Sequence, residues 1–278
     1  MSVILCPNCK SSLVKSERAY ICDMGHTFDL SKEGYLNLLL ANKKNKLNPG
    51  DNKLMVNARE AFLSLGHYDF IIKTIESQLE KIFAGTNKNS KPYHLLDMGC
   101  GSGYYIRELL EDVDFQRIGI DISKQAIVKA AKISKTAIYI VSSIFDLPIK
   151  DSSIDLALSI FSPISLNELE RILKPGGILV KVIPGPEHMQ EIAAMVYDEV
   201  MPHHSTIEAD FESRANLEIS KTLDVKQVLN LEGQALTDFI SMTPYLYKFN
   251  KGALENLPSV TSTISFKVIF VKNSTAEA

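Results

Sequence analysis

Tryptophan is absent from this chain of 278 residues, and long hydrophobic runs are absent as well. No uninterrupted apolar stretch approaches the roughly 20 residues that a membrane-spanning helix needs. The N-terminus also lacks the charged start and the long apolar segment of a secretory signal. We therefore expect a cytoplasmic globular protein with no membrane partner.

A large net charge is also absent, because basic and acidic residues nearly balance. The formal net charge of −3 excludes a protein that coats nucleic acid through overall basicity. The charge is unevenly spread, because residues 1–60 hold nine basic and six acidic side chains, whereas the remainder holds 21 and 27. A polyanionic partner is therefore expected to meet mainly the N-terminal part.

Only four cysteines are present, and three of them fall within the first 22 residues. With one histidine they form the pattern C-x2-C-x12-C-x3-H, whose spacing is typical of tetrahedral zinc sites rather than of a chance group of free thiols. The expected ligands are Cys6, Cys9, Cys22 and His26. Short strands near residues 13–14 and 20–21 would bring the two pairs together. Residues 1–40 are thus predicted to form a small domain held by one structural zinc ion.

A polar connector and two helices are predicted between residues 41 and 90. Lys43, Lys44 and Lys46 cluster ahead of a Pro-Gly pair, either as a solvated loop or as a basic strap for a phosphate backbone. From residue 51 to residue 83 apolar side chains recur at helical spacing, and residues 66–68 break them into two helices.

A strand, a glycine-rich loop and a helix follow one another from residue 93 to residue 110. The loop reads D-x-G-x-G-x-G and contains the candidate cofactor-binding residues Asp97, Gly99, Gly101, Ser102 and Gly103. Asp121 ends the next strand, where an acid chelates the two hydroxyls of a ribose. The carboxylate of Asp97 favours S-adenosylmethionine, which carries an ammonium and a sulfonium, over a dinucleotide, whose pyrophosphate it would repel.

Strands and helices alternate through residues 91–278, which predicts an α/β fold with a mostly parallel, Rossmann-like sheet of seven strands. The expected strands cover residues 93–96, 117–120, 137–141, 154–160, 178–183, 217–225 and 264–270. A helix capped by Ser123 and a helix from about residue 190 to residue 200 are also expected. Ligands bind at the carboxyl ends of parallel strands, so Ser142, Ser143 and Phe161 should lie beside the glycine loop.

Several short motifs share the pattern of one family. They are CPNC, KEGYLNLL, NPGDN, REAFLSLGHY, DMGCGSGYY, PGPEH and SMTPY, and they span nearly the whole chain. This set resembles the 23S rRNA guanine-N1 methyltransferases (RlmA or RrmA), which are class I S-adenosylmethionine-dependent enzymes with an N-terminal zinc domain.

The resemblance implies methyl transfer from S-adenosylmethionine to N1 of a guanine in a hairpin loop of 23S rRNA. It implies that the zinc domain at residues 1–40 recognises RNA, that residues 91–278 form the methyltransferase domain with an antiparallel last strand, and that the protein is a homodimer. It also implies that Tyr68 and His188 line the cofactor pocket and that Ser142 and Ser143 stand beside the adenine.

The motifs leave the catalytic residues open. Phe161 is a candidate for stacking on a flipped base, although a core aromatic at a strand end fits the pattern equally well. Glu187 and His188 are candidate general bases for the N1 proton. Two other functions stay open: a methyltransferase for a small molecule or protein, and a nonenzymatic, zinc-containing RNA-binding assembly factor.

Overall fold

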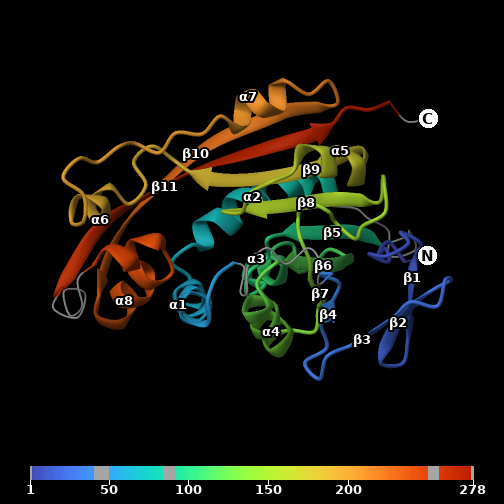
Figure 1. The fold of residues 1–278 in the computed structure, drawn as a ribbon. Helices are drawn as coiled ribbons and strands as arrows, with labels where there is room; N and C mark the ends of the chain where they lie inside the picture. Colours follow the sequence, from blue (N-terminus) through green and yellow to red (C-terminus); the bar gives the residue numbers. More distant parts are fainter. Residues whose placement is uncertain (1, 41–49, 84–91, 250–256, 277–278) are drawn as a thin grey trace.

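The computed structural model describes residues 2–40, 50–83, 92–249 and 257–276. Within these residues the central sheet has eight strands in the order β10-β11-β9-β8-β5-β6-β7-β4 (Figure 1). They are β4 (Leu36–Asn37), β5 (Tyr93–Met98), β6 (Phe115–Asp121), β7 (Ala137–Val141), β8 (Ile154–Ile160), β9 (Leu173–Pro184), β10 (Leu217–Glu232) and β11 (Ser259–Asn273). All neighbouring pairs are parallel except those of β11, which runs against β9 and β10. The mostly parallel α/β sheet and its antiparallel last strand are confirmed.

Helices connect most of these strands. They are α1 (Lys53–Ser64), α2 (Asp69–Phe83), α3 (Tyr104–Glu108), α4 (Lys124–Ile133), α5 (Leu166–Ile172), α6 (Gln190–Ala194), α7 (Ile207–Glu212), α8 (Gly233–Ser241) and the 3-10 helix η2 (Pro244–Lys248). Gly66 has a left-handed φ of +78° and separates α1 from α2 as predicted. The hydroxyl of Ser123 accepts a hydrogen bond from Ala126 N and caps α4. No helix of the described ranges is long and apolar enough to cross a membrane.

Both faces of the sheet are covered, because successive side chains of a strand point to opposite faces. On β5, Leu95 packs into a core that includes residues of α1, α2, α4 and α8, whereas Leu96 packs into a second core with α5 and the N-terminal domain. The two cores pack on opposite faces of the sheet, and the carboxyl ends of its parallel strands lie together at one edge.

The N-terminal domain is a three-stranded antiparallel sheet of β1 (Leu13–Ser16), β2 (Ala19–Cys22) and β3 (Thr27–Asp29). It is joined to the loop between β7 and β8 by backbone hydrogen bonds, from Leu5 N to Pro148 O and from Lys150 N to Val3 O, both 2.8 Å long. The chain then adds β4 in parallel to β7. The small domain is thus attached to β7 and to the loop that follows it.

Three expectations need correction. The sheet has an eighth strand, β4, because a two-residue strand gives no hydrophobic period to read. The helix expected to residue 200 ends at Ala194, since the apolar side chains beyond it, such as the half-exposed Met195, find no core to cover. Strands β10 and β11 extend past the predicted limits, because their long antiparallel pairing continues to Glu232 and Ser259.

Candidate functional site

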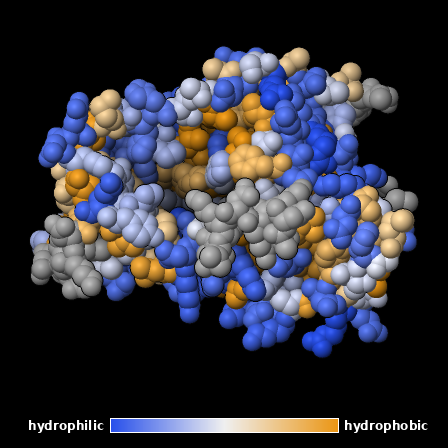
Figure 2. Space-filling view, in the orientation of Figure 1, coloured by the Kyte–Doolittle hydropathy of each residue, from blue (hydrophilic) through white to orange (hydrophobic). Residues whose placement is uncertain are grey.

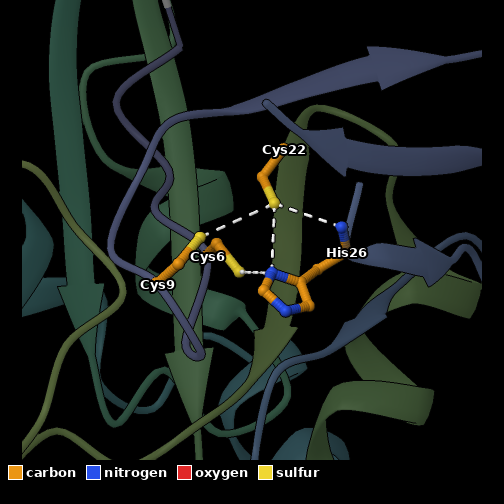
Figure 3. A group of neighbouring side chains, drawn as sticks. All are labelled: Cys6, Cys9, Cys22 and His26. Atoms are coloured by element: carbon orange, nitrogen blue, oxygen red, sulfur yellow. Dashed lines mark hydrogen bonds between the residues drawn. The ribbon is translucent and has the colours of Figure 1, made fainter. Parts of the chain in front are cut away.

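Four metal-ligand side chains meet in the N-terminal domain (Figure 3). The ligand atoms of Cys6, Cys9, Cys22 and His26 all lie within 4.8 Å of one another, and Nδ1 of His26 points toward the three sulfur atoms. Three sulfurs and one imidazole nitrogen around a single point fit a structural zinc ion. The Ser11 hydroxyl, 3.1 Å from the sulfur of Cys9, lowers the pKa of that thiol to about 7, which favours the metal-binding thiolate.

The glycine loop between β5 and α3 can be built only with glycine at two of its positions. Gly99 has a φ of +81°, and a Cβ there would lie 2.5 Å from the Cβ of Ser162. Gly103 has a φ of +78°, and a Cβ there would lie 2.7 Å from the hydroxyl of Tyr139. The loop therefore packs closely against Tyr139 of β7 and against Ser162, which follows β8.

Asp121 ends β6 directly opposite this loop. Its Oδ2 accepts a hydrogen bond from Gly101 N at 2.9 Å, and its Oδ1 accepts one from Ser123 N at 2.7 Å. Burial raises the pKa of the carboxyl, while these two backbone bonds lower it. Each carboxylate oxygen has a second lone pair, so the side chain is held in place and still able to accept from a ligand.

Asp97 lies beneath the loop at the end of β5 and is almost fully buried. Its Oδ2 has no hydrogen-bond partner among the described residues. Burial, and then the charge of Asp121, raise the pKa of Asp97 to about 8. A buried carboxylate oxygen without a partner is costly, and a cationic ligand above the loop would relieve that cost. The site therefore fits a cofactor that carries positive charge.

These groups border one cavity of about 580 Å³, within the size range of small-molecule sites. Its wall includes seven of the predicted cofactor residues: Tyr68, Gly99, Gly101, Ser102, Asp121, Ser143 and His188. The other three are not in the wall: Asp97 is below it, Gly103 packs on Tyr139, and Ser142 faces a small hollow next to the zinc knuckle. Figure 2 shows hydrophobic side chains gathered in a hollow in the middle of this face.

Aromatic rings line the part of the cavity around Phe161. Phe161 follows β8 with a left-handed φ of +55°, and its ring centre lies 4.7 Å from that of Phe266 and 6.2 Å from that of Tyr68. The loop that carries Phe161 is supported from below by Lys181, whose buried ammonium donates to Ser159 Oγ and to Ser162 O. Phe161 is 41% exposed, so it is a wall residue with an accessible ring rather than a core aromatic.

The two candidate bases differ in position. His188 is buried with its ring centre 4.6 Å from that of Phe266, and its Nδ1 has no partner among the described residues. Burial, helped by the nearby His203, lowers the pKa of His188 to about 3. Glu187 is outside the cavity wall and forms an ion pair with Lys226. His188 is therefore neutral at physiological pH, and Glu187 does not face the cavity.

Three further residues of the cavity wall, Asp51, Arg59 and Met242, are linked to one another by hydrogen bonds. The guanidinium of Arg59 on α1 donates to the carboxylate of Asp51 and, at 2.9 Å, to the carbonyl of Met242. Ser123 Oγ donates to Asp51 O at 2.8 Å. Asp51 and Met242 lie inside the motifs NPGDN and SMTPY, which were the only sequence signal for them. Their separation by about 190 residues hides the fact that Arg59 links them.

Comparison with known proteins adds two family models and several relatives. Residues 4–46 match the model described as RlmA, N-terminal, and residues 96–181 match a methyltransferase domain. A putative 23S rRNA (guanine-N1-)-methyltransferase of Bacillus subtilis is 30% identical over 94% of this chain and 93% of its own. The chain belongs to the 23S rRNA (guanine-N1)-methyltransferase family.

Two further members of this methyltransferase family match over shorter regions. The 23S rRNA (guanine(748)-N(1))-methyltransferase of Streptomyces fradiae is 36% identical over 67% of this chain, and the match covers 65% of the relative's own length. A putative enzyme of Micromonospora griseorubida is 30% identical over 67% of both chains. The methyltransferase domain implies S-adenosylmethionine as cofactor, and the zinc ribbon with its Cys3His cluster indicates a structural zinc ion.

Proposed function

We propose that this protein transfers a methyl group from S-adenosylmethionine to N1 of a guanine in a hairpin loop of 23S rRNA. The observation that carries the proposal is the aromatic-walled cavity that opens directly from the glycine loop. Such a cavity suits a planar base placed next to a cofactor, and an enzyme must take a base out of its stack to methylate a ring nitrogen. The acting form proposed is a cytoplasmic homodimer, with residues 1–40 recognising RNA and residues 91–278 transferring the methyl group.

The residues proposed to hold the cofactor are those that surround the glycine loop. When bound, S-adenosylmethionine supplies an electrophilic methyl group on a sulfonium. We assign the ribose hydroxyls to Asp121 and the positive charge of the methionine part to Asp97, whose buried Oδ2 has no partner among the residues that the structure describes. Tyr68 and His188 then close the methionine side and Ser143 the adenine side, while Ser142, which faces the small hollow next to the zinc knuckle, is left without a direct cofactor contact.

Phe161 is proposed to stack on the target guanine and to align its N1 with the methyl group. Methyl transfer is an in-line displacement, for which correct alignment supplies much of the acceleration. A histidine with a pKa of about 3 is a weak base, so His188 is proposed to hold a ligand by accepting a hydrogen bond at Nδ1 rather than to remove the N1 proton. The N1 proton is proposed to pass to water at the open side of the cavity, and S-adenosylhomocysteine leaves as the neutral thioether. Phe161 is thus the residue assigned to acceptor binding.

The proposed contact of Lys43, Lys44 and Lys46 with RNA lies outside the described residues. The acidic balance of residues 61–278 still requires that phosphates be neutralised elsewhere, which the N-terminal part with its positive balance can supply. Residues 1–40 hold four basic and four acidic side chains, so this positive balance lies in residues 41–60, and the zinc domain is proposed as the RNA-recognition element on the family resemblance.

The proposal is tested by mass-spectrometric mapping of methylated nucleosides in rRNA from cells with and without the gene. Loss of one N1-methylguanine from 23S rRNA, restored by the wild-type gene and not by the Asp121→Ala variant, is the expected result. An unchanged set of rRNA methylations would reject it, and a methylated small molecule or protein that disappears with the gene would support the alternative substrate class.

A further inference from the structure

Aromatic side chains also gather at the mouth of the cavity, outside the wall that surrounds the cofactor. Tyr197 follows α6 and is 43% exposed, while Tyr247 on η2 is 65% exposed. Tyr245, also on η2, lines the cavity itself. The two exposed tyrosines, Tyr197 and Tyr247, contribute little to the core and need another explanation, because each lies next to a residue of the cavity wall.

Contacts between these residues hold them at the mouth. The ring centres of Tyr197 and Tyr245 are 6.2 Å apart at an interplanar angle of 68°. Tyr247 accepts a hydrogen bond from Asn52 Nδ2 at 2.8 Å, and its hydroxyl lies 3.6 Å from the sulfur of Met55, a wall residue. Two elements distant in sequence, η2 and the start of α1, therefore keep these rings at the entrance.

A cation completes the group. The Nζ atom of Lys248 lies 5.6 Å from the ring centre of Tyr197, and no acidic partner for it is found in the described part of the chain. Lys248 is therefore the residue of this group that can accept a phosphate. We call Tyr197, Tyr245, Tyr247 and Lys248 the tyrosine rim.

We propose that the tyrosine rim binds the nucleotides that flank the target guanine, with their bases stacked on the tyrosine rings and a phosphate next to Lys248. The inference rests on the proposed function, because a guanine inserted into the cavity leaves its neighbours in the chain at the mouth. Single-stranded RNA is held mainly by stacking on aromatic rings and by cations along the backbone. The rim thus selects an unpaired loop over a duplex, whose bases are already stacked.

The test uses the full-length, zinc-loaded protein and an unmodified transcript of the 23S rRNA hairpin that carries the mapped methylation. Tyr197→Leu and Tyr247→Leu should each weaken RNA binding by about tenfold, since loss of one base stack amounts to a decade or more. Tyr197→Trp and Tyr247→Phe keep a ring and should bind within twofold of the wild type. Affinity for S-adenosylmethionine should be unchanged in all four variants.

A second arm separates stacking from a general structural effect. The flanking nucleotides of the hairpin are made abasic one at a time, and each transcript is tested with each variant. At one of these nucleotides, loss of the base should remove most of the effect of a Tyr→Leu change, because both remove the same stack. Lys248→Met should lower the salt dependence of binding, while Lys272→Met, at the other end of β11, should not.

The outcomes distinguish the two proposals. A wild-type protein that binds S-adenosylmethionine but methylates no RNA would reject the proposed function and the tyrosine rim with it. A wild-type protein that methylates the hairpin, with ring and base losses that add independently at every flanking nucleotide, would reject the tyrosine rim alone.

Discussion

The ammonium of Lys10 in the zinc knuckle forms an ion pair with the carboxylate of Asp146 at 2.8 Å, across the junction between the small domain and the loop that follows β7. The same loop provides Ser143, Ile144 and Phe145 to the cavity wall. Backbone hydrogen bonds from Leu5 to Pro148 and from Lys150 to Val3 extend the junction. The proposed adenine wall and the zinc knuckle therefore share one segment of chain.

Loss of zinc is expected to weaken cofactor binding as well as RNA binding. Without the metal, the knuckle no longer supports the loop after β7, so affinity for S-adenosylmethionine should fall by about five- to tenfold, the lower end of the coupling typical of linked sites. The measurement is calorimetric titration of the Cys9→Ser variant, with elemental analysis to show that zinc is gone. Lys10→Met is the control, because an exposed ion pair contributes little and the zinc site stays intact. Equal affinities with and without zinc would contradict the coupling.

Asp97→Asn is expected to stabilise the free protein. The pKa of Asp97 is about 8 in the folded chain and about 3.9 in an unfolded one, so the folded state binds the extra proton between these values. The stability contributed by this group is complete below pH 4 and is lost as pH rises toward 8. The amide avoids that loss, and its melting temperature should exceed that of the wild type by a few degrees at pH 8 and by less at pH 5. A gain that does not grow with pH would contradict this assignment.

The same carboxyl should release a proton when the cofactor binds. A cation above the loop favours ionised Asp97, so binding at pH 7 should release up to one proton and should strengthen as pH rises toward 8. Calorimetry in buffers of different ionisation enthalpy measures this number directly. The Asp97→Asn variant, which has no proton to lose at this position, should bind more weakly and show no such release.

Asp121→Ala should weaken S-adenosylmethionine binding by at least about tenfold. Charge-assisted hydrogen bonds contribute about 1.5–3 kcal/mol each, and about 1.4 kcal/mol is a decade in affinity. The variant also removes the acceptor for Gly101 N and Ser123 N, so the glycine loop is no longer hydrogen-bonded to residue 121. Asp121→Asn keeps one oxygen acceptor and should show a smaller loss. Unchanged affinity in the alanine variant, measured by calorimetry, would rule out the ribose assignment.

Two glycines of one loop offer a matched pair. Gly99→Ala places a Cβ 2.5 Å from the Cβ of Ser162, whereas Gly101→Ala meets nothing within 4 Å, although both residues have positive φ. The first variant should therefore lose about 1–3 kcal/mol more of unfolding free energy than the second, since it adds overlap to backbone strain. Denaturant unfolding without cofactor measures the difference. Equal losses would mean that the loop end at Ser162 moves aside freely.

The sequence was sufficient for features that depend on local spacing. The zinc ligands, the separation of α1 from α2 and the Ser123 cap follow from patterns a few residues long. The pairing of Arg59 with Met242 and the tilted ring contact of Phe161 with Phe266 depend on how distant segments meet, and no local pattern encodes that. The Lys181 ammonium beneath Ser162 was hidden because a lysine in a strand is normally read as exposed.

The two residues of β4 link the zinc ribbon to the edge of the large sheet. They cover the outer side of β7, at the end of the parallel strands, where an exposed row of backbone amides and carbonyls invites pairing with another chain. Leu38 N extends this protection with a hydrogen bond to Val141 O at 3.0 Å. When metal is scarce, the ribbon loosens and uncovers that edge, so zinc starvation should turn this protein toward aggregation. We therefore expect the amount of newly made protein that stays soluble to fall as zinc is withdrawn.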